Sequence, residues 1–121
     1  MKSKLRTDLL DSEIVSLVGH DEDGEAKIYF LQAPESTKGT YIEYEIYDVQ
    51  EAYHDENTEK ALTNYIQVSI FSHGDYTEVE KTVRSILKNK GYDGGYGPDL
   101  YEKDTKLNHK PLRFTYTEIL D

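Results

Sequence analysis

The chain contains no cysteine and no tryptophan, and its 121 residues include only three phenylalanines and three prolines. Without cysteine there is no disulfide bond, no thiolate metal site and no cysteine nucleophile. No stretch of about 18 apolar residues occurs, and the N-terminus becomes acidic before an apolar signal core could form. We therefore expect an untargeted, soluble protein with no membrane partner, and the length favours a single domain over residues 1–121.

Basic residues are also scarce: the chain has 14 Lys and Arg but 24 Asp and Glu, which gives a net charge of −10. A protein that grips DNA usually gathers Lys and Arg on one face, so this composition disfavours a DNA clamp. It is compatible with a surface past which DNA slides without binding. The 11 tyrosines combine a ring that can be buried with a polar hydroxyl, which suits a sheet surface that contacts a partner.

The hydrophobic pattern predicts an α+β fold. We expect a mostly antiparallel sheet of four to six strands, with an N-terminal helix and one central helix packed on one face. The N-terminal pattern fits one bent helix or two short ones, with Asp11 or Ser12 as a cap and Gly19 at the end. A capping box from Thr77 to Glu80 opens the central helix. The expected segments are helices over 4–18 and 77–90, strands over 27–32, 41–47, 64–72 and 112–119, a mobile loop over 51–63 and a turn-rich stretch over 91–110.

The stretch YIEYEIY at residues 41–47 alternates with the two-residue period of a half-buried strand. The same alternation continues in the two later strands and sorts their side chains onto two faces. The face expected beneath the helices carries Ile42, Tyr44, Ile46, Ile66, Val68, Ile70, Leu112, Phe114 and Tyr116. The opposite face carries Tyr41, Glu43, Glu45, Tyr47, Tyr65, Gln67 and Arg113, and we expect Glu43 and Glu45 to pair with Arg113 or with a lysine of a neighbouring molecule.

Glu43 and Glu45 could in principle form a catalytic pair, because residues two apart on one strand face lie roughly 6.5–7 Å apart. This distance overlaps the carboxylate separation of inverting glycosidases. However, the sequence has no G-x-S-x-G turn and no phosphate-binding glycine loop, and its four histidines lack metal-ligand spacing. We therefore predict no catalytic, cofactor or metal site, and an enzyme is the weakest interpretation.

The order of features along the chain resembles the tail terminator, or tail completion, proteins of long-tailed bacteriophages. The resemblance covers about residues 5–119 and is carried best by SLVG followed by IYFLQAP in 16–34, and by E-x-D-T-x-L-x-H-K-x-x-R-F in 102–114. Between them lie TYIEYEIY, YIQVSIFS and one helix. Thr40 stands where a proline would be expected before the Tyr-Ile pair.

This resemblance implies a structural protein of the virion, made in the bacterial cytoplasm and located at the head-proximal end of the tail. Such proteins form a ring, typically of six copies, that stops polymerisation of the tail tube and docks to the head-tail connector or stopper. The implied partners are other copies of the chain, the tube protein and the connector, while DNA passes through without specific binding. No cofactor is implied.

Within such a ring, the polar face of the sheet is expected to form the subunit or partner interface, because head-to-tail contacts need two complementary surfaces. The acidic loop is expected at the channel or docking rim and contains Glu51, His54, Asp55, Glu56 and Glu59. One other hypothesis remains: a small acidic binding module that mimics DNA charge, with its carboxylates in residues 21–25 and 51–59 arrayed on one face.

Overall fold

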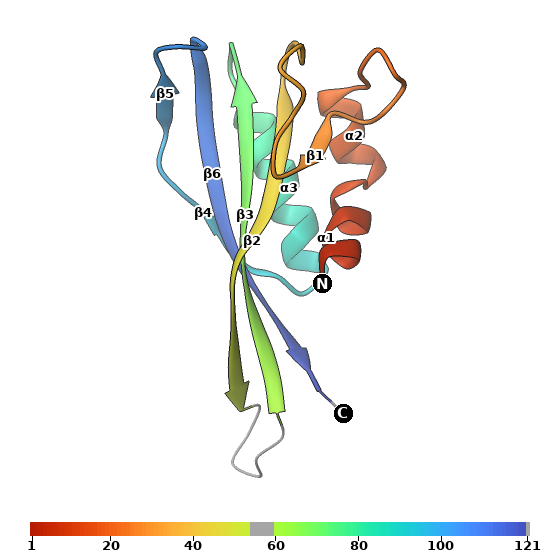
Figure 1. The fold of residues 1–121 in the computed structure, drawn as a ribbon, viewed down its shortest axis with the longest axis vertical. Coiled ribbons are helices and arrows are strands. Elements are labelled where there is room, and N and C mark those ends of the chain that lie inside the picture. The colour runs from red at the N-terminus through yellow and green to blue at the C-terminus, as the bar shows by residue number, and fades with distance from the viewer. Residues whose placement is uncertain (54–59, 121) are drawn as a thin grey trace.

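The computed structural model describes residues 1–53 and 60–120 and has an α+β fold, as the sequence pattern predicts (Figure 1). Three helices pack on one face of a six-stranded mixed sheet within these residues. The elements are α1 (Lys2–Leu9), α2 (Ser12–Val18), β1 (Ile28–Phe30), β2 (Tyr41–Tyr53), β3 (Lys60–Ser72), α3 (Thr77–Asn89), β4 (Asp93–Tyr96), β5 (Leu100–Glu102) and β6 (Leu107–Ile119).

The sheet is built around β3, which pairs with β2 on one side and β6 on the other over nearly its full length. The strand order is β1-β2-β3-β6-β4, with β5 also paired to β6. Only the β1–β2 pair is parallel, and all other described pairs are antiparallel. Because β2 and β6 are each antiparallel to β3, these two strands run in the same direction.

The N-terminal segment forms two short helices, one of the two arrangements that the sequence allowed. The carboxylate of Asp11 accepts the backbone N–H of Glu13 at 3.0 Å, so Asp11 caps the start of α2 as predicted. Gly19 ends this helix with a φ of +76°, which a side chain would disfavour.

The predicted capping box at the start of α3 is wrong. The N-cap position is Tyr76, whose side chain makes no capping hydrogen bond. Asp75 takes this role instead, since its Oδ1 accepts the backbone N–H of Thr77 at 2.9 Å and the Thr77 hydroxyl at 2.6 Å. These two bonds lower the pKa of Asp75.

Two segments predicted as loops are largely strand. Residues 51–53 and 60–63, placed in a mobile loop, extend β2 and β3, and residues 54–59 lie outside the described part. The turn-rich stretch 91–110 contains β4, β5 and the first part of β6. Both segments were missed because β4 and β5 are short and because residues 51–53 and 60–63 carry few large apolar side chains, so that the hydrophobic alternation is weak.

The core lies between the helices and the even-numbered face of the sheet, as the alternation predicts. Tyr44, Val68 and Phe114 are at most 1% exposed, whereas Ile46 and Tyr116 at the edge of this core are half-buried. The helices contribute apolar residues at helical spacing, namely Leu5, Leu9, Ile14, Val18, Val79, Val83 and Leu87. The core therefore fixes which sheet face is covered and which is left open.

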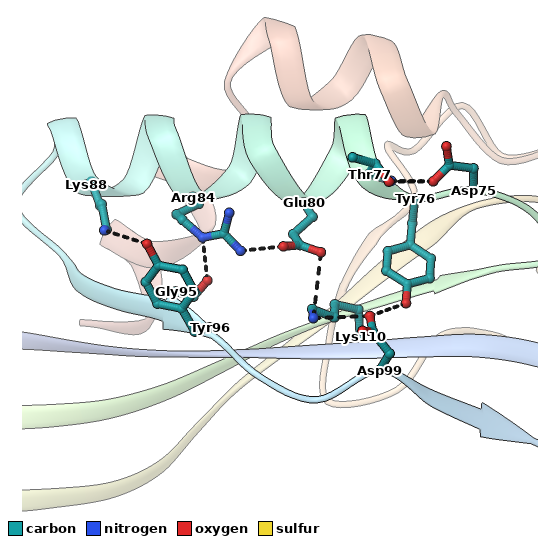
Figure 2. A network of polar contacts seen from close by, with 10 residues as sticks. All are labelled: Asp75, Tyr76, Thr77, Glu80, Arg84, Lys88, Gly95, Tyr96, Asp99 and Lys110. Carbon is teal, nitrogen blue, oxygen red and sulfur yellow. Dashed lines mark hydrogen bonds and ion pairs between the residues drawn. The ribbon is translucent and has the colours of Figure 1, made fainter.

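A polar network holds the β4–β5 connection against α3 (Figure 2). The buried Lys110 of β6 lies with its Nζ 3.1 Å from Asp99 and 3.8 Å from Glu80. The hydroxyl of Tyr76 donates a hydrogen bond to the same Asp99 carboxylate, and burial together with this bond raises the pKa of Tyr76 to about 12. The network therefore attaches the segment that precedes β5 to both the helix and the sheet.

Arg84 of α3 holds β4 against the same helix. It pairs with Glu80 and donates through Nε to the carbonyl of Gly95 at 2.7 Å. Its guanidinium lies 4.4 Å from the ring centre of Tyr96. A Cβ on Gly95 would meet the Phe114 ring at 2.6 Å, so glycine allows β4 to approach the sheet this closely.

The far half of the β2–β3 hairpin, together with the end of β6, projects past the ends of α1 and α3 (Figure 1). We call this projection the arm; its described residues are 47–53, 60–65 and 115–120. The arm is a three-stranded ribbon, and it exposes several apolar side chains. Val49 and Ile119 are each 47% exposed and Leu120 is 39% exposed.

Candidate assembly surface

The seven residues predicted for the polar sheet face lie together on the face that the helices leave uncovered. We call this the open face; it comprises Tyr41, Glu43, Glu45, Tyr47, Tyr65, Gln67 and Arg113. The strand register places Glu45, Gln67 and Arg113 in one row across β2, β3 and β6. The residues that the sequence alternation placed together therefore form one contiguous surface.

A register shift between Ile46 and Asp48 makes Tyr47 the extra residue of a β-bulge in β2. The Tyr47 ring lies 6.2 Å from that of Tyr65, and the Arg113 guanidinium lies 5.2 Å from its centre. Tyr47 remains 45% exposed despite these contacts. Tyr47 is therefore an accessible aromatic side chain in the middle of the open face, held in place by Tyr65 and Arg113.

The expected pairing of Glu43 or Glu45 with Arg113 is not present. Arg113 instead donates through Nε to Gln67 Oε1 at 3.2 Å. Neither glutamate forms an ion pair with any described residue of the chain. The reason is geometric: β3 separates β2 from β6, so Gln67 is the nearer acceptor for Arg113.

Glu43 lines an open hollow of about 490 Å³, whose walls include residues 32–35 together with Thr105 and Leu107. One carboxylate oxygen accepts the backbone N–H of Ala33 at 2.8 Å. Burial raises the pKa of Glu43, and the charges of Glu102 and Glu45 add to this effect. Glu43 is therefore a partly desolvated carboxylate beside an accessible hollow.

An aromatic stack borders this hollow, and two of its members were absent from the predicted site. Phe71 packs between Tyr41 and His109, with ring centres 4.9 Å and 4.3 Å away. Burial lowers the pKa of His109. The odd-numbered alternation of β3 contained the signal for Phe71, but His109 lay in a stretch predicted as turns, so its place on β6 was not foreseen.

The predicted docking loop is only partly within the described structure. Glu51 is an exposed residue of β2 in the arm. His54, Asp55, Glu56 and Glu59 lie outside the described residues, so their placement stays a prediction.

The part of the chain that is described contains no group of three His, Asp or Glu residues arranged to hold a metal ion. None of the helices in residues 1–53 and 60–120 is long and apolar enough to cross a bilayer.

No protein-family model matches the chain, and no curated protein matches it. Among solved structures, the fold is similar to a chain described as "Virion of native gene transfer agent (GTA) particle". The superposition has a TM-score of 0.68 and covers 95% of this chain and 91% of that chain, at 15% sequence identity. At this identity the likeness establishes a shared fold over nearly the whole of both chains.

Proposed function

We propose that the chain is a non-enzymatic structural protein of a bacteriophage-like particle. The observation that carries this proposal is the match of the fold over 95% of this chain, at a TM-score of 0.68, to a chain of a gene transfer agent virion. Coverage above nine-tenths of both chains means that no large catalytic insertion distinguishes one from the other. A virion location follows from the same argument.

More specifically, the protein is a tail terminator: a ring, of six copies, that caps the head-proximal end of the tail tube and joins it to the head connector. Two independent lines support this assignment. The order of sequence features resembles that family over about residues 5–119, and the fold resembles a chain from a virion. Its partners are then other copies of itself, the tube protein and the connector or stopper.

The open face supplies the contact chemistry for this role. It combines accessible tyrosines with unpaired carboxylates and a guanidinium, a composition that suits an interface with a polar rim. Glu43 and Glu45 have no cation within the described subunit, so a basic side chain of a neighbour or partner is their complement. Acidic residues of the arm, such as Glu51, then face the channel or docking rim and repel passing DNA.

The DNA-mimic hypothesis receives less support from the arrangement of the acidic residues. A mimic requires carboxylates spread over one face, but residues 21–25 follow α2 at one end of the molecule and Glu51 lies on the arm at the other (Figure 1). Asp21 is also engaged internally, since it accepts hydrogen bonds from the Tyr29 hydroxyl and the backbone of Glu25.

Tube-growth arrest tests the proposed function. Purified tube protein of the same particle is allowed to polymerise with and without this chain, and the tubes are measured by electron microscopy. The proposal predicts shorter tubes with a ring at one end when the chain is present. Tubes of unchanged length without end rings, together with tight binding of the isolated chain to a basic DNA-binding enzyme, would favour the mimic instead.

A further inference from the structure

The arm has two unpaired strand edges, one on each side. Near the helices, the outer edge of β2 is covered by β1 at residues 42–44, and the outer edge of β6 is covered by β5 at 107–109 and by β4 at 113–115. Beyond these points no described strand pairs with the outer edge of either strand. An uncovered edge of this kind is a template for pairing with another strand.

The hydrogen-bond pattern identifies which backbone groups point outward from these edges. Alternate residues of an antiparallel strand turn their N–H and C=O groups away from the partner. Leu120 donates its N–H to Lys60 of β3, so the neighbouring odd-numbered positions, Ile119 and Thr117, face outward. On β2, Val49 faces outward, because its N–H is accepted by the Asp48 carboxylate at 2.9 Å rather than by β3.

Asp48 therefore covers the β2 edge in the separate subunit. Its Oδ1 accepts the outward N–H of Val49, and its Oδ2 accepts the side-chain amide of Gln50 at 2.9 Å. A charged side chain at an edge is a device that limits indiscriminate strand pairing. The bulge at Tyr47, one residue earlier, adds to this protection.

We propose that the β2 edge of the arm pairs in parallel with the β6 edge of the next copy, so that the arms of successive subunits form one continuous sheet around the ring. This inference rests on the proposed ring and specifies how its subunits join. A second copy of the chain can pair with either edge, since each copy that is added covers one exposed edge and brings its own exposed edge for the next copy. The pairing is parallel in a ring of equally oriented subunits, because β2 and β6 run in the same direction.

Exposed apolar side chains flank both edges on the same side of the arm. Val49 is opposite Asn64 in the register and therefore shares the helix-side face, and Leu120 continues the even-numbered positions of β6 on that face. Edge pairing brings β2 of one copy, including Val49, beside the arm segment of β6 of its neighbour, which Leu120 follows. It thereby covers side chains that are 47% and 39% exposed in the single subunit.

Proline substitution at an outward position tests the pairing without breaking the internal ladder, because only the outward N–H is removed. The variants are Val49→Pro on β2 and Thr117→Pro on β6, with Val49→Thr and Thr117→Ser as controls that keep the N–H. Losing one backbone hydrogen bond at each contact weakens association by roughly two- to tenfold. We therefore expect both proline variants, but neither control, to lose end rings and tube-growth arrest.

The absence of native cysteine allows a second measurement that does not depend on proline. A Gln50→Cys/Thr117→Cys double variant, whose two exposed positions lie at one level of the arm in a row with Thr63, is bound to tubes and oxidised. It should give a ladder of covalent multimers, whereas each single variant should not. This ladder decides the matter if circular dichroism shows that a proline variant has lost its fold.

The outcomes separate the two proposals. Edge pairing would be overturned, and the terminator function left intact, by either of two results. One is that the proline variants arrest tube growth as the wild type does. The other is that the double cysteine variant caps tubes with rings but gives no ladder of covalent multimers. A wild-type protein that neither caps nor shortens tubes would overturn the function, and edge pairing with it.

Discussion

The guanidinium of Arg113 on β6 lies 5.2 Å from the ring centre of Tyr47 on β2, although β3 separates the two strands. Arg113 also donates to Gln67 on the intervening strand at 3.2 Å. These contacts connect all three long strands on the open face at the level where the arm begins. Arg113 thus positions an exposed tyrosine and contributes the positive charge at the centre of an otherwise acidic surface.

Replacing Arg113 with glutamate should block assembly while leaving the subunit folded. The exchange removes a cation–π contact worth about 0.5–1 kcal/mol at an exposed site, and it adds a carboxylate in the row that already holds Glu45. We expect a small decrease in the free energy of unfolding by urea denaturation but loss of tube-growth arrest. Arg113→Lys, which keeps the charge, is the control, and full arrest by Arg113→Glu would remove Arg113 from the interface.

The assignment of the two sheet faces predicts that substitutions on the covered face reduce stability much more than substitutions on the open face. Val68 and Phe114 are buried on the helix-covered face, so replacing either with alanine should cost roughly 2–4 kcal/mol through the cavity that remains. Glu45→Gln on the open face should change the free energy of unfolding by less than about 0.5 kcal/mol. A denaturation series in which Glu45→Gln is the most damaging change would contradict this assignment.

The partly desolvated Glu43 predicts a pH dependence of stability. Burial raises its folded-state pKa, so the folded protein holds the proton more tightly than the unfolded chain does. Stability should therefore fall as pH rises through the ordinary glutamate value of about 4.3 and onward to the raised value. Glu43→Gln should remove this fall and make the variant the more stable protein at neutral pH, but not at low pH.

Urea denaturation of both proteins across this pH range provides the measurement. Glu45→Gln makes the same change in net charge on the same strand face and serves as the control. Equal pH profiles for the wild type and Glu43→Gln would show that desolvation of Glu43 has no effect on folding.

Asp48 should restrain self-association of the separate subunit. Asp48→Ala removes the acceptor that occupies the outward N–H of Val49, so the β2 edge becomes available at lower protein concentration. Sedimentation velocity should then show larger species than the wild type forms. Asp48→Asn retains an oxygen acceptor and should behave more like the wild type, and identical sedimentation of all three proteins would exclude this restraint.

The sequence predicted the two sheet faces because the relevant strands alternate strongly where one face is buried. Ile42, Tyr44 and Ile46 could be read as one face directly, and Ile66, Val68 and Ile70 repeat the pattern. The cap at Asp11 and the stop at Gly19 were likewise local features that depend on one side chain or one φ angle. Such features need no tertiary information.

Residues 51–53 and 60–63 of the arm and the β4–β5 segment were not predicted as strands, for related physical reasons. Residues 47–51 of β2, which include Asp48 and Glu51, are all exposed, so nothing in their pattern separates strand from loop. Gly94 and Gly95 form β4 with positive φ angles, which a sequence pattern marks as turns. The hydrogen bond of Arg113 to Gln67 rather than to a glutamate depends on strand order, and strand order is a property of the tertiary fold.

The length of the tails made in the absence of the protein tests the central claim most directly. A particle system deleted for this gene, and the same system complemented by the wild-type chain, would be compared by electron microscopy of tails and heads. The account predicts that the deletion yields filled heads without tails, together with free tails that overgrow into a broad length distribution, and that complementation restores one length. Tails of normal, uniform length joined to heads in the deletion would contradict the terminator function.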